Sequence, residues 1–355
     1  MSSTETDLAA LPDLASRRLG GSVVYANDDL FAEKENLIKA EPPVFAAGQF
    51  GPRGKVYDGW ETRRRREPGH DHAIVRLGVP GVVRGVTVDT SFFKGNFPPE
   101  ISVEAVSADG YPAPAELAGM RWHPLVERTA AAGDAVNRYP VTDPHRWTHL
   151  RLSIYPDGGV ARFRVHGEPA PDPAFLAGTV DLAAVENGGR VAGCSDDFYA
   201  SAVHLIMPGS ATGMADGWEN ARRRKGGNDY VTVALAAAGL IREVEIDTSY
   251  FVGNAPGWGR LLGASAAGQA LPAEADWHEL LSRTALQPDT RHRFLVSPAG
   301  PVSSAGPVTH VRLDVFPDGG VARLRVRGEL LPAELTRLAE RHLRLLPDGS
   351  GQPEA

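Results

Sequence analysis

Alternating apolar and polar residues mark most of the regular segments in this sequence. The segments 149–156 (HLRLSIYP) and 161–167 (ARFRVHG) alternate in this way, and the intervening PDGG supplies turn residues, so the pattern predicts two strands joined as a hairpin. The segments 73–78 (AIVRLG) and 82–90 (VVRGVTVDT) predict a second pair of strands, separated by VPG. Leucines recur at helical spacing most clearly at 332–346, which predicts a helix.

The same pattern occurs twice along the chain. Residues 58–96 align with 216–254 at a constant offset of 158, with 20 identities in 39 positions, so the internal spacing of each copy is preserved. Residues 148–168 match 309–329 at an offset of 161. An offset that changes only between well-matched blocks indicates loop insertions in two homologous domains, and not a short-period solenoid.

The predicted fold class is all-β. Short strands, 39 glycines and 28 prolines favour a β-sandwich in each half. The order of D-G-W, two strands and an F-x-G-N-x-P loop resembles the galactose-binding (discoidin-like) jelly roll. We therefore predict two tandem homologous jelly-roll β-sandwich domains and a short C-terminal helix. The predicted boundaries are an N-terminal tail at 1–20, the two repeats at 21–180 and 181–335, and the helix end and tail at 336–355.

Composition and charge exclude several classes of partner. Lys plus Arg number 37 against 44 Asp plus Glu, a formal charge of −7, which gives no support to general binding of nucleic acid or anionic membrane. Cys194 is the only cysteine, so the chain has no internal disulfide framework. No apolar run reaches the roughly 20 residues of a membrane span. We expect a cytoplasmic protein.

Two arginine blocks contrast with this acidic composition. Residues 64–66 recur as 222–224, and three adjacent arginines cannot all face one core. Ion pairs with Asp71 and Asp229, or with a neighbouring subunit, would give them a structural role. A guanidinium also presents paired donors that match a carboxylate. The candidates for binding an anionic substrate are therefore Arg64, Arg65, Arg222 and Arg223.

Glutamate and histidine recur beside these blocks. Glu61 and Glu219 precede the arginines, and His123 and His278 occupy matching W-H-x-L positions, so these four are the candidate catalytic residues for proton transfer. A histidine beside a tryptophan can equally be a structural hydrogen-bonding residue, and Trp60 and Trp218 are expected in the core. The D-T-S-[FY]-F-x-G-N block adds further candidates for substrate binding, which are Asp89, Asp247, Asn96 and Asn254.

A metal site has weaker support. His70 and His72 would lie on one face of a strand and are candidates for holding a divalent metal. The second copy has Asn228 and Tyr230 there, so such a site would be confined to the first repeat. No other cofactor is indicated, because the sequence contains no phosphate-cradling glycine motif and no nucleophile elbow.

The combination of motifs resembles one family. Two copies of D-G-W-E-[TN]-x-R-R-R, each followed by D-T-S-[FY]-F-x-G-N and W-H-x-L, closely resemble the allantoicase family over nearly the whole chain. The resemblance implies hydrolysis of allantoate to (S)-ureidoglycolate and urea, on tandem jelly-roll domains that form a homo-oligomer. The competing interpretation is a non-catalytic, discoidin-like tandem module that binds carbohydrate or another ligand.

Overall fold

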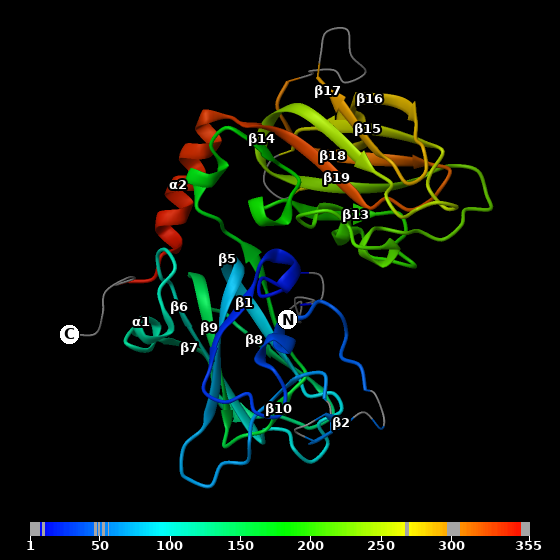
Figure 1. The fold of residues 1–355 in the computed structure, drawn as a ribbon. Helices are drawn as coiled ribbons and strands as arrows, with labels where there is room; N and C mark the ends of the chain where they lie inside the picture. The colour runs from blue at the N-terminus through cyan, green and yellow to red at the C-terminus, as the bar shows by residue number, and fades with distance from the viewer. Residues whose placement is uncertain are drawn as a thin grey trace, which may run out of the picture. The chain divides into compact units, whose positions relative to one another are not determined.

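The computed structural model describes residues 8, 11–45, 48, 50–51, 54–55, 57–266, 270–296 and 306–348. The chain divides into two compact units, one formed by residues 1–170 with 342–355 and the other by residues 171–341. Each unit consists mainly of antiparallel strands (Figure 1). The prediction of two jelly-roll β-sandwich domains is confirmed.

In the first unit the main sheet has the order β1-β5-β9-β6-β7, and β8 and β11 also pair with β5. The short strands β10 and β4 pair with each other, as do β2 and β3. The elements are η2 (Arg17–Leu19), β1 (Ser22–Ala26), η3 (Lys34–Ile38), β2 (Phe50–Gly51), β3 (Gly54–Lys55), β4 (Trp60–Glu61), β5 (Asp71–Asp89), β6 (Glu100–Val106), α1 (Pro114–Ala118), β7 (His123–Ala130), β8 (Val136–Pro140), β9 (Arg146–Tyr155), β10 (Gly159–Val160) and β11 (Arg162–Pro169).

Strand β5 belongs to both layers of the sandwich. Its first part pairs with β1 and β9, and its second part pairs with β8 and β11. The register against β9 shifts between Arg76 and Gly81, around Pro80, where the strand passes from one layer to the other. The prediction of two separate strands at 73–78 and 82–90 is therefore wrong, because the V-P-G segment bends the strand without ending it.

The predicted hairpin through PDGG is also wrong. Among the described residues β9 pairs with β5 and β6, whereas β11 pairs with β5. The turn at 156–159 connects the two layers, and the segment 156–161 contacts both ends of β5. The amide of Asp71 donates to the carbonyl of Pro156 at 3.2 Å, and the amide of Ala161 donates to the carbonyl of Asp89 at 2.7 Å. Both ends of the longest strand therefore meet at one edge of the sandwich.

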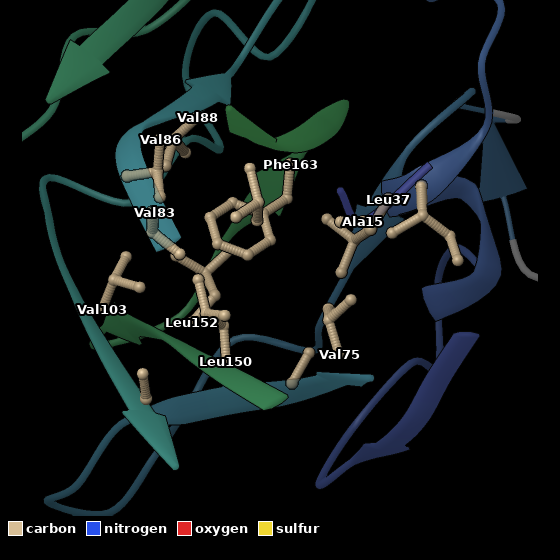
Figure 2. Packing of buried hydrophobic residues seen from close by; sticks show 14 of the residues in the cluster. Ala15, Leu37, Val75, Val83, Val86, Val88, Val103, Leu150, Leu152 and Phe163 are labelled. Carbon is tan, nitrogen blue, oxygen red and sulfur yellow. The ribbon is translucent and has the colours of Figure 1, made fainter. Parts of the chain in front are cut away.

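The core of the first unit lies between the two layers that β5 connects. Val75 from the first part of β5 belongs to the same buried cluster as Val86 and Val88 from the second part (Figure 2). Leu152 of β9 and Phe163 of β11 fill the space between them and are fully buried. Apolar residues on both parts of the bent strand thus close the sandwich around one core.

Both tryptophans of the repeated D-G-W motif are core residues, as expected. Trp60 and Trp218 are fully buried, and each indole N–H donates to a backbone carbonyl at 2.8 Å. The aspartate of the motif pairs with a buried arginine: Arg162 Nη2 lies 2.7 Å from Asp58 Oδ2, and the equivalent pair of the second unit is 3.1 Å apart. The motif therefore anchors the segment that leads into the arginine block.

Part of the segment expected to be an N-terminal tail packs into the first unit. Leu14 and Ala15 are fully buried, and the amide of Leu14 donates to the carbonyl of Val165 at 2.7 Å. Residues before position 20 thus contribute to the core, and the domain boundaries drawn from the sequence stay predictions.

The second unit repeats this plan. Its main sheet has the order β12-β19-β14-β18-β15-β16, with β13 and β17 also paired to β14. The register of β14 against β18 shifts between Ala234 and Gly239, at the position equivalent to the bend of β5. The elements are η4 (Pro173–Leu176), β12 (Thr179–Asp181), η5 (Val185–Asn187), β13 (Arg190–Cys194), η6 (Ala202–Ile206), η7 (Met214–Asp216), β14 (Asp229–Asp247), β15 (Trp258–Ala264), η8 (Glu274–Asp276), β16 (His278–Ala285), β17 (Arg291–Leu295), β18 (Val308–Phe316) and β19 (Arg323–Leu330).

The predicted C-terminal helix is confirmed as α2 (Pro332–Leu345), which has no buried residue. Among the residues described, no helix is both long and apolar enough to cross a lipid bilayer.

The turn at 156–159 gives a testable requirement for glycine. Gly158 has a φ of +142°, and a Cβ there would lie 2.7 Å from the nitrogen of Pro98. Gly158→Ala should lower the thermal unfolding midpoint, because strained backbone of this kind costs roughly 1–3 kcal/mol. Gly95→Ala is the matched control, since its added methyl group meets no atom within 4 Å. Calorimetry showing equal midpoints for both variants would contradict the assigned role of the turn.

Candidate active site

A glutamate–asparagine hydrogen bond occurs at the same place in both units. Asn96 Nδ2 donates to Glu61 Oε1 at 2.6 Å, and Asn254 Nδ2 donates to Glu219 Oε1 at 2.6 Å. Each pair joins two sequence blocks whose paired residues are 35 positions apart. The structure therefore brings together four of the residues singled out in the sequence, one pair in each repeat.

Backbone contacts hold Glu61 in place from two sides. Its amide donates to the carbonyl of Ala32 at 3.1 Å, and its strand partner on the other side is Gly159 of β10. The amide of Gly159 in turn donates to the carbonyl of Asn96 at 2.7 Å. The end of the 156–159 turn thus fixes the glutamate strand and the asparagine loop relative to each other.

Asp89 and Asp247 shape the loop that carries the asparagine. Each carboxylate accepts a hydrogen bond at 2.8 Å from the amide two residues later, which is the amide of Ser91 or Ser249. Aspartate commonly starts a turn in this way. These contacts give both aspartates a structural role in the loop, and they lend no support to the expectation that the aspartates bind substrate.

Glu61 lies in an environment that suits an acid. Burial raises the pKa of its carboxyl above the ordinary value for glutamate, and the hydrogen bond from Asn96 opposes that rise. A carboxylic acid that keeps its proton to higher pH can donate it to a leaving group near neutral pH. Burial and a raised pKa are the properties that a general acid requires.

One arginine of each block forms an ion pair with a buried aspartate. Arg65 Nη1 lies 2.6 Å from Asp71 Oδ1, and Arg223 pairs with Asp229 in the same way. Both aspartates are 1% exposed. The structural interpretation of the arginine blocks is confirmed for these two residues, so their first role is to neutralise buried charge.

The neighbouring arginines of each block are exposed. They make no hydrogen bond or ion pair with any residue that the structure describes, and they are Arg64, Arg66, Arg222 and Arg224. A pocket of about 380 Å³ opens beside the block of the first unit, lined by Asn27, Asp28, residues 63–67 and Asp71. Two of the four arginines in this lining are neutralised by the aspartates that they contact. Arg64 and Arg66 therefore supply the positive charge available to an anion.

His123 and His278 do not lie beside the glutamates. His123 pairs with Ala105, near the C-terminal end of β6. The strand begins at Glu100, four residues after Asn96. The five intervening residue steps span about 17 Å of strand. His278 has the equivalent position at the start of β16. The strand direction thus separates the predicted Glu–His pairs, and their joint role in proton transfer has no support.

His70 and His72 lie near each other, with ring centroids 6.1 Å apart. Burial and the positive charge of Arg151 lower the pKa of both imidazoles. Across the described ranges of the chain, no group of three or more His, Cys, Asp or Glu side chains is placed to hold a metal ion. The candidate metal pair therefore has no third ligand of these types among those residues.

Sequence reasoning missed two residues that organise the pocket. Asn27 Nδ2 donates to Asp71 Oδ1 at 2.8 Å, and Asp157 Oδ2 accepts from the amide of Arg65 at 2.8 Å. Asp157 belongs to the PDGG segment that is identical in both halves, which was a usable signal. Asn27 gave no such signal, because the second copy has Ser195 at that position.

Comparison with known proteins agrees with the repeat and the fold. A family model described as "Allantoicase repeat" matches residues 12–170 and again 180–331. A probable allantoicase of Nocardia farcinica is 56% identical over 90% of this chain and 94% of its own length. One from Streptomyces coelicolor is 48% identical over 94% of this chain and 89% of its own. The crystal structure of allantoicase from Saccharomyces cerevisiae has a TM-score of 0.74 at 33% identity, covering 89% of this chain and 92% of that chain.

Paired and unpaired arginines should respond differently to truncation. Arg65→Ala would leave Asp71 buried without its cation, which costs roughly 1.5–3 kcal/mol and should lower the thermal midpoint. Arg64→Ala removes an exposed side chain and should leave the midpoint close to that of the unaltered protein. Thermal unfolding of the two variants measures the contrast. Equal destabilisation by both would show that Arg64 also has a structural role.

Proposed function

The chain belongs to the allantoicase family, and we propose that it hydrolyses allantoate to (S)-ureidoglycolate and urea at the edge of the sandwich that carries the Glu–Asn pair. The observation that carries the proposed site is the hydrogen bond at 2.6 Å between Glu61 and Asn96, repeated between Glu219 and Asn254. Membership of an enzyme family favours catalysis over the alternative of a carbohydrate-binding module.

The substrate explains why a proton donor is needed. Allantoate carries one carboxylate and two ureido groups on a single carbon, so release of urea breaks a carbon–nitrogen bond at an aminal carbon. Urea is a poor leaving group unless its departing nitrogen receives a proton. A well-placed general acid contributes roughly 10²–10⁴-fold to the rate of such a step.

We assign this proton to Glu61. The protonated carboxyl gives its proton to the departing nitrogen while the lone pair of the remaining ureido nitrogen helps to break the bond. Water then adds to the same carbon and returns one proton to the Glu61 carboxylate, so that the acid is restored and atoms and charges balance. One residue acts first as acid and then as base, and no histidine is required.

The substrate carboxylate is assigned to the unpaired arginines. In the first unit Arg64 and Arg66 line the pocket and are not neutralised by the aspartates of its lining. A guanidinium binds a carboxylate with two parallel hydrogen bonds. Arg222 and Arg224 offer the same groups in the second unit, so either repeat or both can carry the site.

Location and assembly stay proposals. A cytoplasmic location is supported by the single cysteine, Cys194, and a homo-oligomer is supported by what the family resemblance implies.

Urea release from allantoate by the purified chain tests the proposed function. We expect urea and ureidoglycolate in equal amounts. Absence of urea under all conditions, with and without added divalent metals, would favour a binding module.

Glu61→Gln tests the role of the acid. The near-isosteric change should lower kcat by roughly 10²–10⁴-fold with the fold intact. Because burial raises the pKa of Glu61, the protonated form persists above the usual range of glutamate, and kcat/KM of the unaltered chain should fall as the pH rises through that pKa. In the Glu61→Gln variant, kcat/KM should no longer fall as the pH rises through this range.

Glu219→Gln is the matched variant in the second repeat. If only one of the two variants loses turnover, the repeat that carries it holds the active site. Full turnover with an unchanged pH profile in both variants would contradict the assignment of proton transfer to these glutamates.

A further inference from the structure

Two atoms of the ion pair beside the pocket are buried without a hydrogen-bond partner among the described residues. Asp71 Oδ1 accepts from Arg65 and Asn27, but Asp71 Oδ2 has no donor, and Arg65 Nε has no acceptor. Asp71 is 1% exposed, and both residues line the pocket of the first unit. Buried polar atoms without partners are uncommon in folded proteins and often mark a functional site.

These two buried atoms are an unused acceptor and an unused donor on paired side chains. A ureido group, –NH–CO–NH₂, shows the complementary pair on one planar edge: its N–H can donate to Asp71 Oδ2, and its carbonyl oxygen can accept from Arg65 Nε. A carboxylate has no N–H to offer, and it would be repelled by the negative charge of Asp71. The pair is therefore suited to the ureido end of a ligand and unsuited to the acidic end.

We infer that Asp71 and Arg65 recognise a ureido group of the substrate, which makes Asp71 a specificity-determining residue. The inference rests on the proposed function and deepens it. Arg64 and Arg66 are left for the carboxylate, so a ligand that carries both groups is oriented by two kinds of contact in one pocket.

Neighbouring hydrogen bonds fix the orientation of the pair. Asp157 Oδ2 accepts from the amide of Arg65 at 2.8 Å, and Asn27 spans two contacts: its Nδ2 donates to Asp71, and its Oδ1 accepts from the amide of His72 at 2.7 Å. Because Asp71 Oδ1 is engaged by two donors, the carboxylate cannot turn without losing both. Preorganisation of this kind reduces the entropy lost on binding.

The second unit keeps the ion pair but differs around it. Arg223 Nε is also buried without a hydrogen-bond partner among the described residues. Neither carboxylate oxygen of Asp229 is buried and unpartnered in this way. Ser195 replaces Asn27 and donates its hydroxyl to Asp229 Oδ1 at 2.9 Å. We therefore assign ureido recognition to the first unit, and Asp229→Asn becomes the matched control.

Calorimetric titration of the full chain with two small acids tests the inference. N-carbamoylglycine carries one carboxylate and one ureido group, and N-acetylglycine has a methyl group in place of the terminal amino group. The unaltered chain should bind N-carbamoylglycine about 10- to 100-fold more tightly, which is the effect of one charge-assisted hydrogen bond.

Asp71→Asn should reduce this preference to below about threefold. The amide oxygen must take the place of Oδ1 to accept from Arg65 and Asn27, which leaves an NH₂ group facing the ureido N–H. Asp229→Asn should leave the preference unchanged. Arg65→Lys keeps a cation beside Asp71 but removes the Nε donor, and it should also lose the preference.

The outcomes separate the inference from the proposed function. No preference in the unaltered chain, or full preference retained in Asp71→Asn, overturns ureido recognition, even if the chain releases urea from allantoate. A chain that shows the preference and releases no urea retains the inference and loses the proposed function. If Asp71→Asn does not fold, the unaltered chain and Arg65→Lys decide the matter.

Discussion

The turn at 156–159 contacts the segments that carry Glu61, Asn96, Arg65 and Asp71. Together with Ala161, which follows it closely in the chain, the turn contacts both ends of the bent strand β5. It also pairs with the strand of Glu61, donates a hydrogen bond to the carbonyl of Asn96 and accepts one from the amide of Arg65. The turn at 317–320 makes the equivalent contacts in the second unit, with the amide of Gly320 donating to Asn254 at 2.8 Å and the amide of Arg223 donating to Asp318 at 2.7 Å. A bend in the middle of one long strand makes this possible, because it returns the end of the strand to the edge where the strand began.

The two repeats share their central side-chain contacts but differ in the residues around them. The Glu–Asn hydrogen bond and the Arg–Asp ion pair occur in both units. The surroundings differ: Arg63 pairs with Asp28 in the first unit, whereas the second has Ala221 at the arginine position. His70 and His72 likewise have no histidine counterpart in the second copy. The Glu–Asn pair, to which we assign proton transfer, is thus common to both halves, and features that could select a ligand differ between them.

Much of the fold and part of the site could be predicted from the sequence. Alternation identified the strands, the constant spacing of the repeat identified two domains, and the ion pairs of Arg65 and Arg223 were anticipated as the structural role of the blocks. Strand partners were not predictable in the same way, because alternation reports that a segment is extended but not which strand it pairs with or whether it changes layers. That is why the PDGG hairpin and the split of β5 were wrong. The same limit misplaced His123, since matching positions in two copies show equivalence and say nothing of distance to Glu61.

The central claim is that allantoate binds between the unpaired arginines and the Glu–Asn pair. A crystal structure of the Glu61→Gln variant with allantoate bound tests this most directly. The account predicts the substrate carboxylate within hydrogen-bond distance of Arg64 or Arg66, and a ureido nitrogen within reach of the residue 61 side chain. Allantoate bound beside His123 or His278, with residue 61 beyond hydrogen-bond reach, would contradict it.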